Sequence, residues 1–226
     1  MSNKIIGIFG WKVTETSYGV TIPYLQYANQ FGDVRILGID EPPNVDLDLL
    51  IIPGGADINP NRYKAIPDYY TGKSDPIKEY QDTVILPEYI EMGIPIFGIC
   101  RGMQTIAVHF GAGLVQNMYH ETNENDRSDL VHDVDIVKID GFTAEKISVN
   151  SLHHQCVSYT DFPECLEIVG VYRSKKKNGP YRNSIEIIKH RTLPIWGVQY
   201  HPEELENDPF GDKIINELLN HERVYV

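Results

Sequence analysis

The sequence predicts an α/β fold: a mostly parallel sheet flanked by helices, with a small antiparallel addition. Short strand-like and helical segments alternate along the first half of the chain, which is typical of parallel strands joined by crossover helices. Two strand candidates, Val34–Ile39 and Leu47–Ile52, are nearly continuous apolar runs, as expected of strands covered on both faces. The second half contains several short β-patterned runs in succession, which favours an antiparallel extension.

The N-terminal segments supply the first elements of this fold. Ile5–Phe9 is an apolar run and is predicted to form the first strand. A helix is expected to begin near Thr21-Ile22-Pro23, because proline suits the first turn of a helix. After the two apolar strands, a polar and tyrosine-rich segment extends from Asn59 to about Ser74.

The middle of the chain continues the alternation of helix and strand. Asp75–Met92 is predicted to be helical, and Pro87 should kink or break that helix because it lacks an N–H donor. A strand then ends at Gly98, and a helix follows to about Phe110, with apolar side chains at the spacing of one helix face.

The remaining segments complete the expected domain. Four short strands are predicted: Asp133–Ile139, Leu166–Tyr172, Ser184–Lys189 and Ile195–Gln199. A last helix should start at Asp208-Pro209, where a capping residue precedes a proline. No internal repeat, low-complexity tract or linker interrupts the pattern, so we expect one domain over residues 1–226.

Composition narrows the class of protein. A hydrophobic fraction of 42% and a charged fraction of 23% are ordinary globular values. The three cysteines lack the spacing of a disulfide framework, and no signal peptide or membrane-spanning run is recognised, so we expect a cytoplasmic protein. A net charge of -12 argues against a nucleic-acid partner, which would require a basic face.

The most informative segment joins a predicted strand to a predicted helix through Gly98-Ile99-Cys100-Arg101-Gly102. A nucleophile between two glycines at such a junction indicates a sharp elbow that projects the side chain above the sheet. The thiol would also face the N-terminus of the helix, where free N–H groups favour a thiolate. Cys100 is therefore a candidate nucleophile, although a single buried cysteine is more often a small apolar residue.

A base for this nucleophile is predicted near the other end of the chain. The apolar run Ile195–Gln199 leads into Tyr200-His201-Pro202-Glu203. If its strand lies near the one that precedes Cys100, His201 can accept the thiol proton and Glu203 can fix the imidazole tautomer. A lone histidine is usually only a satisfied polar residue, but the two motifs together favour a Cys-His-Glu triad.

A glycine pair, Gly54-Gly55, follows another predicted strand. Strand ends at one edge of a parallel sheet line a common crevice, so this loop should lie near Cys100. The N–H groups of Gly55 and Arg101 could then form an oxyanion hole, worth about 3–4 kcal/mol per donor. The alternative is an ordinary Gly-Gly turn.

The polar cluster Asn150-Ser151-Leu152-His153-His154-Gln155 stands within a β-patterned region. Such side chains can hold carboxylate and ammonium groups, so the cluster is a candidate substrate-recognition loop, and surface residues on a strand edge are the alternative. A metal site is not expected, because no second cluster has ligand spacing. No cofactor is expected either.

Taken together, these motifs resemble the class I glutamine amidotransferase superfamily, and within it most closely the γ-glutamyl hydrolase branch that includes γ-glutamyl-γ-aminobutyrate hydrolase. Four segments carry the resemblance: Pro53–Pro60, Gly98–Gln104, Asn150–Gln155 and Gly197–Glu203. The matches run in family order from Ile5 to Glu203. The resemblance implies a flavodoxin-like fold of the class I glutamine amidotransferase type.

The resemblance also implies a role for each candidate residue. Cys100 would be the nucleophile, His201 the base and Glu203 the orienting acid. Three further residues match positions near the γ-glutamyl group: Gln104, Ser151 and His153. The oxyanion and substrate-binding loop would contain Gly54, with the amides of Gly55 and Arg101 as the oxyanion donors.

Three departures from the branch pattern stand out, and the first two leave the identity of the leaving amine open because they lie close to the substrate rim. Asp40–Asn44 differs from the usual Leu-Pro style ending, Lys78-Glu79 stands where an Arg-Asp pair is common, and Tyr200 replaces a Trp or Phe. The tyrosines Tyr63, Tyr69 and Tyr70 could form an aromatic rim that selects the amine, and exposed loop residues are an equal alternative.

The expected function is hydrolysis of the γ-glutamyl amide bond of a small γ-glutamyl substrate through a γ-glutamyl thioester. Two alternatives stay open. One is a glutaminase subunit of a glutamine amidotransferase that supplies ammonia to a separate synthetase. The other is a non-catalytic γ-glutamyl-binding protein, which the intact Cys100, His201 and Glu203 disfavour. A homodimer and a synthetase partner are both compatible with the sequence.

Overall fold

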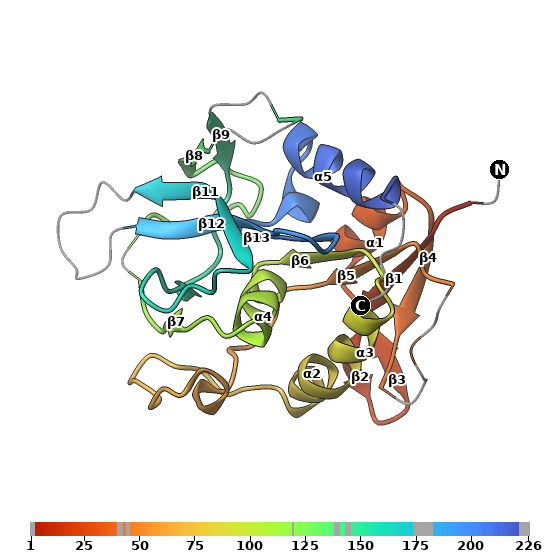
Figure 1. Ribbon diagram of the computed structural model, residues 1–226, viewed down its shortest axis with the longest axis horizontal. Coiled ribbons are helices and arrows are strands. Elements are labelled where there is room, and N and C mark those ends of the chain that lie inside the picture. Colours follow the sequence, from red (N-terminus) through yellow and green to blue (C-terminus); the bar gives the residue numbers. More distant parts are fainter. Residues whose placement is uncertain are drawn as a thin grey trace.

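The computed structural model describes residues 3–39, 43, 46–118, 120–137, 141–142, 146–173 and 183–221. A nine-stranded sheet runs through the molecule (Figure 1). In order across the sheet, its strands are β4 (Asp33–Leu37), β1 (Ile5–Phe9), β5 (Leu49–Ile52), β6 (Ile96–Ile99), β13 (Ile195–Val198), β12 (Asn183–His190), β11 (Leu166–Arg173), β8 (His132–Ile136) and β9 (Lys146–Val149).

The direction of the strands confirms the predicted fold class. Strands β4, β1, β5, β6 and β13 pair in parallel, whereas β12, β11, β8 and β9 continue the same sheet in antiparallel fashion. Two small antiparallel pairs stand apart: β7 (Leu114–Val115) with β10 (Cys156–Val157), and β2 (Trp11–Thr14) with β3 (Ser17–Gly19).

Helices cover both faces of the parallel strands (Figure 1). One face carries α1 (Ile22–Ala28) and α5 (Pro209–Leu219); the other carries α2 (Pro76–Tyr80), α3 (Leu86–Glu91) and α4 (Arg101–His109). Side chains of β5 alternate between the two cores, with Leu49 and Ile51 packed beside α1 and α5 and Leu50 and Ile52 beside α3 and α4. This double coverage explains the continuous apolar pattern of the strand.

The helical segment after residue 75 differs from its prediction. Pro87 does not break it, because a π-helical turn at Gln81–Ile85 joins α2 to α3. The Leu86 N–H reaches back five residues to the Gln81 carbonyl. The wider turn accommodates a residue that cannot donate to the regular helical ladder.

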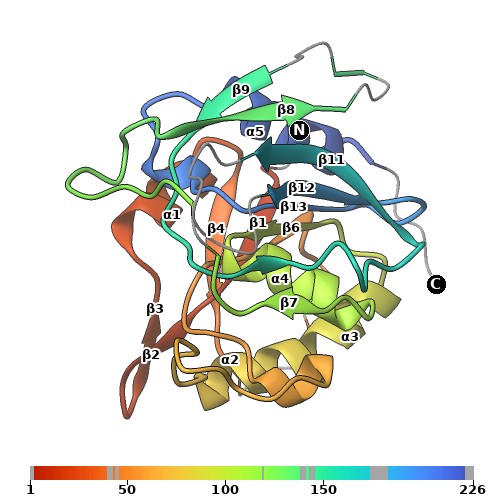
Figure 2. The ribbon, with the colours of Figure 1, turned by 90° about the vertical axis from the view of Figure 1, so that its left-hand side faces the viewer.

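Five of the strands have no counterpart in the sequence prediction: β2, β3, β7, β9 and β10. Both β2 and β9 alternate apolar and polar residues, but each has only four residues, the shortest run that alternation can identify as a strand. The β2–β3 hairpin nevertheless lies beside α2 (Figure 2), which brings Trp11 towards the loops at the sheet edge. The predicted end of one strand at Ile139 and most of the Asp40–Asn44 departure lie outside the described residues.

The topology brings the functional motifs to one edge of the sheet. Strands β5, β6 and β13 are adjacent and parallel, with Ile52 opposite Gly98 and Ile99 opposite Val198. Their carboxyl ends therefore lie side by side. The loop with Gly54-Gly55, the elbow at Cys100 and the segment that leads to His201 all start from this edge.

Candidate active site

Cys100 forms the sharp turn between β6 and α4. Its backbone has φ 53° and ψ −107°, a conformation that costs a non-glycine residue about 1–3 kcal/mol. The Cys100 N–H donates to the Val198 carbonyl at 2.7 Å, which ties the strained turn to β13.

Glycines on both sides of this turn are required by space. A Cβ at Gly102 would lie 2.0 Å from the Ile52 carbonyl oxygen, and one at Gly98 would lie 2.6 Å from the Gly102 backbone. Since no side chain fits at either position, α4 can start directly above β5 and β6. The elbow geometry that the sequence predicts is present in the structure.

His201 faces Cys100 from the end of β13. Its Nδ1 is 2.7 Å from Glu203 Oε1, and its ring lies beside the Cys100 side chain. Asn150 holds the His201 backbone from two sides, accepting from its N–H at 2.8 Å and donating to its carbonyl at 2.9 Å. All four side chains are buried.

The electrostatics of this group favour a charged imidazole. Burial alone would lower the pKa of His201, but the neighbouring Glu203 carboxylate and the Cys100 side chain raise it to about 10. An imidazolium beside a cysteine stabilises the thiolate, which is the reactive form of the nucleophile.

The glycine loop after β5 lies against the same group. A Cβ at Gly54 would lie 3.2 Å from His201 Cε1 and 3.6 Å from Cys100 Cβ, so glycine permits this close approach. The Gly54 N–H donates to Tyr24 Oη at 2.9 Å and is therefore already engaged. Within the described residues, the neighbouring Gly55 N–H has no acceptor.

The Arg101 side chain fixes the position of this loop. It is 2% exposed, and its Nε donates to the Ala56 carbonyl at 2.5 Å. Its guanidinium also lies 2.8 Å from Asp82 and 3.2 Å from Glu79. The network therefore holds the residue after Gly55 at a set distance from the first turn of α4, where the Arg101 N–H has no intrahelical partner.

A small pocket of about 60 Å³ opens on one side of Cys100. It is lined by Gly55, Asp57, Cys100, Arg101, Gln104, Leu152, His153, His154 and Gln155. The Gln104 amide donates to the Gln155 carbonyl and to Gln199 Oε1, both at 3.1 Å. Four of the sequence-predicted substrate and oxyanion residues are thus brought together here: Gly55, Arg101, Gln104 and His153.

Asp57 also lines this pocket. It was not among the predicted site residues, although it lies within the Pro53–Pro60 segment. It accepts from Gly72 N–H at 2.7 Å and Gln155 Nε2 at 3.2 Å, and lies 3.1 Å from His154 Nε2. The hydrogen bond to Asp57 raises the pKa of His154. Asp57 therefore joins the glycine loop to the polar cluster.

Ser151 was also predicted to lie near the substrate, but it does not line the small pocket. It is fully buried, and its hydroxyl pairs with His120 Nε2 at 3.0 Å. His153 continues this buried layer: its Nδ1 is 2.9 Å from the Gln155 carbonyl, and its Nε2 is 3.8 Å from Glu186 Oε1. Burial lowers the pKa of His153 well below its ordinary value, so the ring is neutral.

A larger cavity of about 660 Å³ opens beside His201 and the glycine loop. It is lined by Trp11, Thr21, Pro23, Tyr24, Gly54, Gly55, Ala56, Asp75, Lys78, Arg127, His201 and Glu204. None of the three rim tyrosines predicted from the sequence lies among these residues. Tyr69 is 94% exposed and Tyr70 is 54% exposed, so the alternative of exposed loop tyrosines fits these two.

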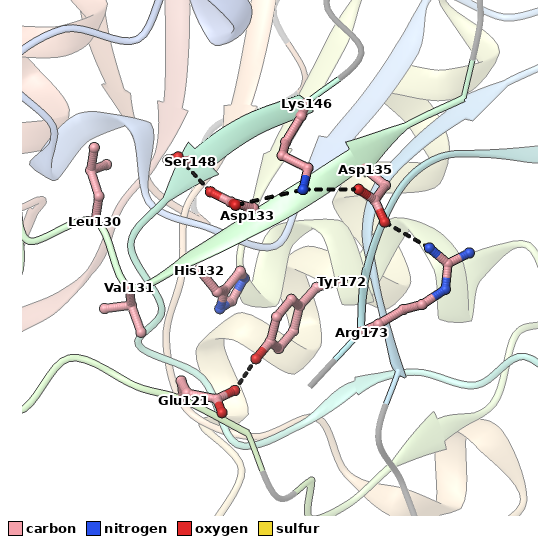
Figure 3. Close-up of a pocket in the computed structure, with 10 residues that line it drawn as sticks. All are labelled: Glu121, Leu130, Val131, His132, Asp133, Asp135, Lys146, Ser148, Tyr172 and Arg173. Carbon is pink, nitrogen blue, oxygen red and sulfur yellow. Dashed lines mark hydrogen bonds and ion pairs between the residues drawn. The ribbon is translucent and has the colours of Figure 1, made fainter. Parts of the chain in front are cut away.

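A separate cavity of about 380 Å³ lies along β8, β9 and β11 (Figure 3). His132 stacks on Tyr172 at its base, with ring centroids 3.8 Å apart, and Arg173, Asp135, Lys146 and Asp133 form a charged row above. His132 Nε2 is also 3.7 Å from Glu186 Oε2. The cavity thus reaches the buried layer behind His153 but contains no residue of the Cys100 group.

Two further features are absent from the described parts of the chain. No cluster of three or more histidine, cysteine or acidic residues there has the arrangement of a metal site. None of the described helices has the length and apolar character needed to cross a membrane.

Comparison with known proteins gives related sequences and folds. The sequence profile described as Peptidase C26 matches residues 44–203. A protein described as glutamine amidotransferase-like, YvdE of Lactococcus lactis, is 28% identical over 83% of this chain and 81% of its own length. Anthranilate synthase component 2 of Azospirillum brasilense is 30% identical over 66% of this chain and 69% of its own length.

A solved structure extends the likeness to the whole fold. The glutaminase domain of Trypanosoma brucei CTPS, with bound acivicin, aligns with a TM-score of 0.64 and 16% identity. The alignment covers 99% of this chain and 96% of that domain. At this identity the likeness shows a shared class I glutamine amidotransferase fold.

Proposed function

The chain belongs to the Peptidase C26 family, and we propose that it is a cysteine-dependent hydrolase that cleaves the γ-glutamyl amide bond of a small γ-glutamyl compound. The observation that carries the proposal is the group Cys100, His201 and Glu203, set between two pockets of very different size. A small polar pocket suits an acyl group of defined length. A wide cavity suits a variable leaving amine.

The reaction begins with attack by the Cys100 thiolate on the γ-carbonyl carbon. A carbon–sulfur bond forms, and the carbonyl electrons move to the oxygen, which the N–H groups of Gly55 and Arg101 stabilise. When the tetrahedral intermediate collapses, the carbon–nitrogen bond breaks. His201 Nε2 gives its proton to the departing amine, while Glu203 keeps the opposite nitrogen protonated.

The second half of the reaction consumes water. Neutral His201 takes a proton from a water molecule, the hydroxide attacks the γ-glutamyl thioester, and the carbon–sulfur bond breaks to release glutamate. Each step uses only side chains and amides of this chain, so the proposal requires no metal or organic cofactor. We also propose that the chain acts as one domain, because a single sheet carries Cys100 and His201 on adjacent strands.

Product analysis tests the proposal. The native protein and Cys100→Ala should be incubated with glutamine, γ-glutamyl-γ-aminobutyrate, a γ-glutamyl-polyamine and a poly-γ-glutamate, with glutamate and free amine measured. Hydrolysis of a γ-glutamyl amide other than glutamine, lost in the variant, is the expected result. Absence of turnover on every γ-glutamyl compound, with the protein folded, contradicts it.

A second candidate is the glutaminase subunit of an amidotransferase that passes ammonia to a synthetase. The likeness to an anthranilate synthase component 2 favours this candidate. It predicts that glutamine is the preferred substrate and that turnover by the isolated chain is slow. Hydrolysis of glutamine that is stimulated when a synthetase partner is added would support it over the free-standing hydrolase.

A further inference from the structure

We propose that Lys78 is a specificity residue that selects a leaving amine bearing an anionic group, such as a carboxylate. The inference rests on the proposed γ-glutamyl amide hydrolysis and names the part of the substrate which that proposal leaves open. It follows from where Lys78 lies, from how the other charges of the large cavity are engaged, and from the side of the triad on which the amine departs.

The Lys78 side chain reaches from α2 to the glycine loop. The residue is only 4% exposed, and it lines the large cavity together with His201. A Cβ placed on Gly55 would lie 2.4 Å from Lys78 Cε and 3.2 Å from its Nζ, so the ammonium lies directly against the predicted oxyanion loop. On its other side, Nζ lies 5.3 Å from the centroid of the Trp11 ring.

The other charged groups of this cavity are already engaged. Arg127 Nε is 2.7 Å from Glu204 Oε1, so these two residues neutralise each other. Asp75 caps α2 by accepting from the N–H groups of Ile77 and Lys78 at 2.8 and 3.3 Å. Among the described residues, no carboxylate lies within ion-pair distance of Lys78 Nζ, so this ammonium has no direct counter-ion, although Asp75 and Asp82 act on it from farther away.

A buried cation without a direct counter-ion is unfavourable by itself and becomes more favourable when an anion enters. The amine must depart into the large cavity, because the pocket of about 60 Å³ on the other side of Cys100 suits the acyl group. An anionic group on that amine would meet Lys78, with the Trp11 ring beside it. A polyamine leaving group would instead place like charges together.

Matched substrates test the selection directly. The first is γ-glutamyl-γ-aminobutyrate, and the second is its primary amide, which has the same length without the charge. The native enzyme should prefer the acid by about tenfold or more in kcat/KM, the discrimination typical of a hydrogen bond to a charged group. In Lys78→Met the preference should fall to about twofold or less, chiefly through loss of turnover on the acid.

Two variants serve as controls. Lys12→Met removes an exposed cation from the hairpin that carries Trp11, and should keep the native preference. Lys78→Arg keeps the charge and should retain part of the preference for the acid. Equal losses on acid and amide in Lys78→Met would overturn the inference, because they would indicate support of the fold or of the reaction in general.

The pH dependence of the native protein supplies a test without substitution. Burial and the Arg101 cation lower the pKa of Lys78 to about 8, against opposing effects of nearby anionic groups. The charged or titratable groups around it are Asp75, Asp82, Cys100, Arg101, Arg127, His201 and Glu204. As pH rises past 8 the ammonium loses its charge, so the acid-to-amide ratio should fall, whereas in Lys78→Met it should stay flat.

Binding separates this inference from the proposed function. Calorimetry on Cys100→Ala with the acid and with the amide measures selection in the absence of turnover. Tighter binding of the acid, abolished by adding Lys78→Met, supports the inference even if the native protein hydrolyses neither compound. Equal binding of the two compounds overturns it even if both are hydrolysed.

Discussion

The two sides of Cys100 differ in construction. The small pocket is closed by residues from the glycine loop, α4 and the Asn150–Gln155 segment, joined by hydrogen bonds through Asp57 and Gln104. The large cavity is open and is bounded by the β2–β3 hairpin, α1 and α2, and its wall contains one lysine, Lys78, without a direct counter-ion among the described residues. Under the proposed function, the hydrogen-bonded network would hold a fixed acyl group, whereas few side chains would recognise the variable amine.

The largest effect on activity is expected from the substitution of Cys100, on which both sides depend. Cys100→Ala should lower kcat for every γ-glutamyl substrate by at least about 10⁴-fold, as loss of a nucleophile does in other triads. Because both pockets remain, the acid should still bind. Residual turnover above that level, measured by glutamate release, would place the nucleophile elsewhere.

The next effect concerns the base, and its size should not depend on the identity of the leaving amine. In Glu203→Gln the imidazolium loses its neighbouring carboxylate, so the pKa of His201 should fall from about 10. Activity should drop about 10²–10⁴-fold. The alkaline limb of the pH profile should also move to lower pH, because the imidazolium deprotonates earlier.

A full pH profile of kcat/KM on the acid and on the amide measures both the loss of activity and the shift of the alkaline limb in Glu203→Gln. The profile should shift equally for the two substrates, since Glu203 lies behind His201. An unchanged alkaline limb in Glu203→Gln would contradict the assignment of Glu203 as the partner of the imidazole.

A substitution in the small pocket tests whether the small pocket and the large cavity act independently. Gln104→Ala removes the amide that donates to the Gln155 carbonyl, in the pocket wall, and to the buried Gln199 side chain. It should lower kcat/KM about 10–100-fold for acid and amide alike, leaving their ratio unchanged. This result contrasts with that expected for Lys78→Met. A change in the ratio would show that the two pockets are not independent.

The contrast between the two sides also explains what the sequence could predict. The strand-helix junction at Cys100 and the His201-Pro202-Glu203 segment are local patterns whose glycines and apolar runs follow directly from elbow geometry. The parallel order of β5, β6 and β13 then brings them together. Cys100, His201 and the oxyanion candidates Gly55 and Arg101 were accessible from the sequence for this reason, whereas the roles of Gln104 and His153 were implied only by the family resemblance.

The walls of the large cavity could not be predicted in the same way. Trp11 belongs to a largely exposed strand of only four residues, and Lys78 lies in a short helix where a lysine ordinarily points to solvent. Arg127 stands in a polar loop. These residues meet only through tertiary packing. A sequence pattern therefore does not distinguish them from ordinary surface residues. The tyrosines proposed from the sequence as an aromatic rim show the converse, because none of them lines the large cavity.

The smallest expected effect tests whether the tyrosine loop belongs to the surface that binds the leaving amine. Tyr69 is 94% exposed and contacts the Tyr70 ring, with centroids 5.3 Å apart, outside the large cavity. Tyr69→Ala should therefore change kcat/KM by less than about twofold on both acid and amide, as expected of a surface site. Selective loss on one substrate would mean that the tyrosine segment closes over the amine. In that case the leaving group would be recognised by two surfaces, Lys78 with Trp11 on one side and the loop tyrosines on the other.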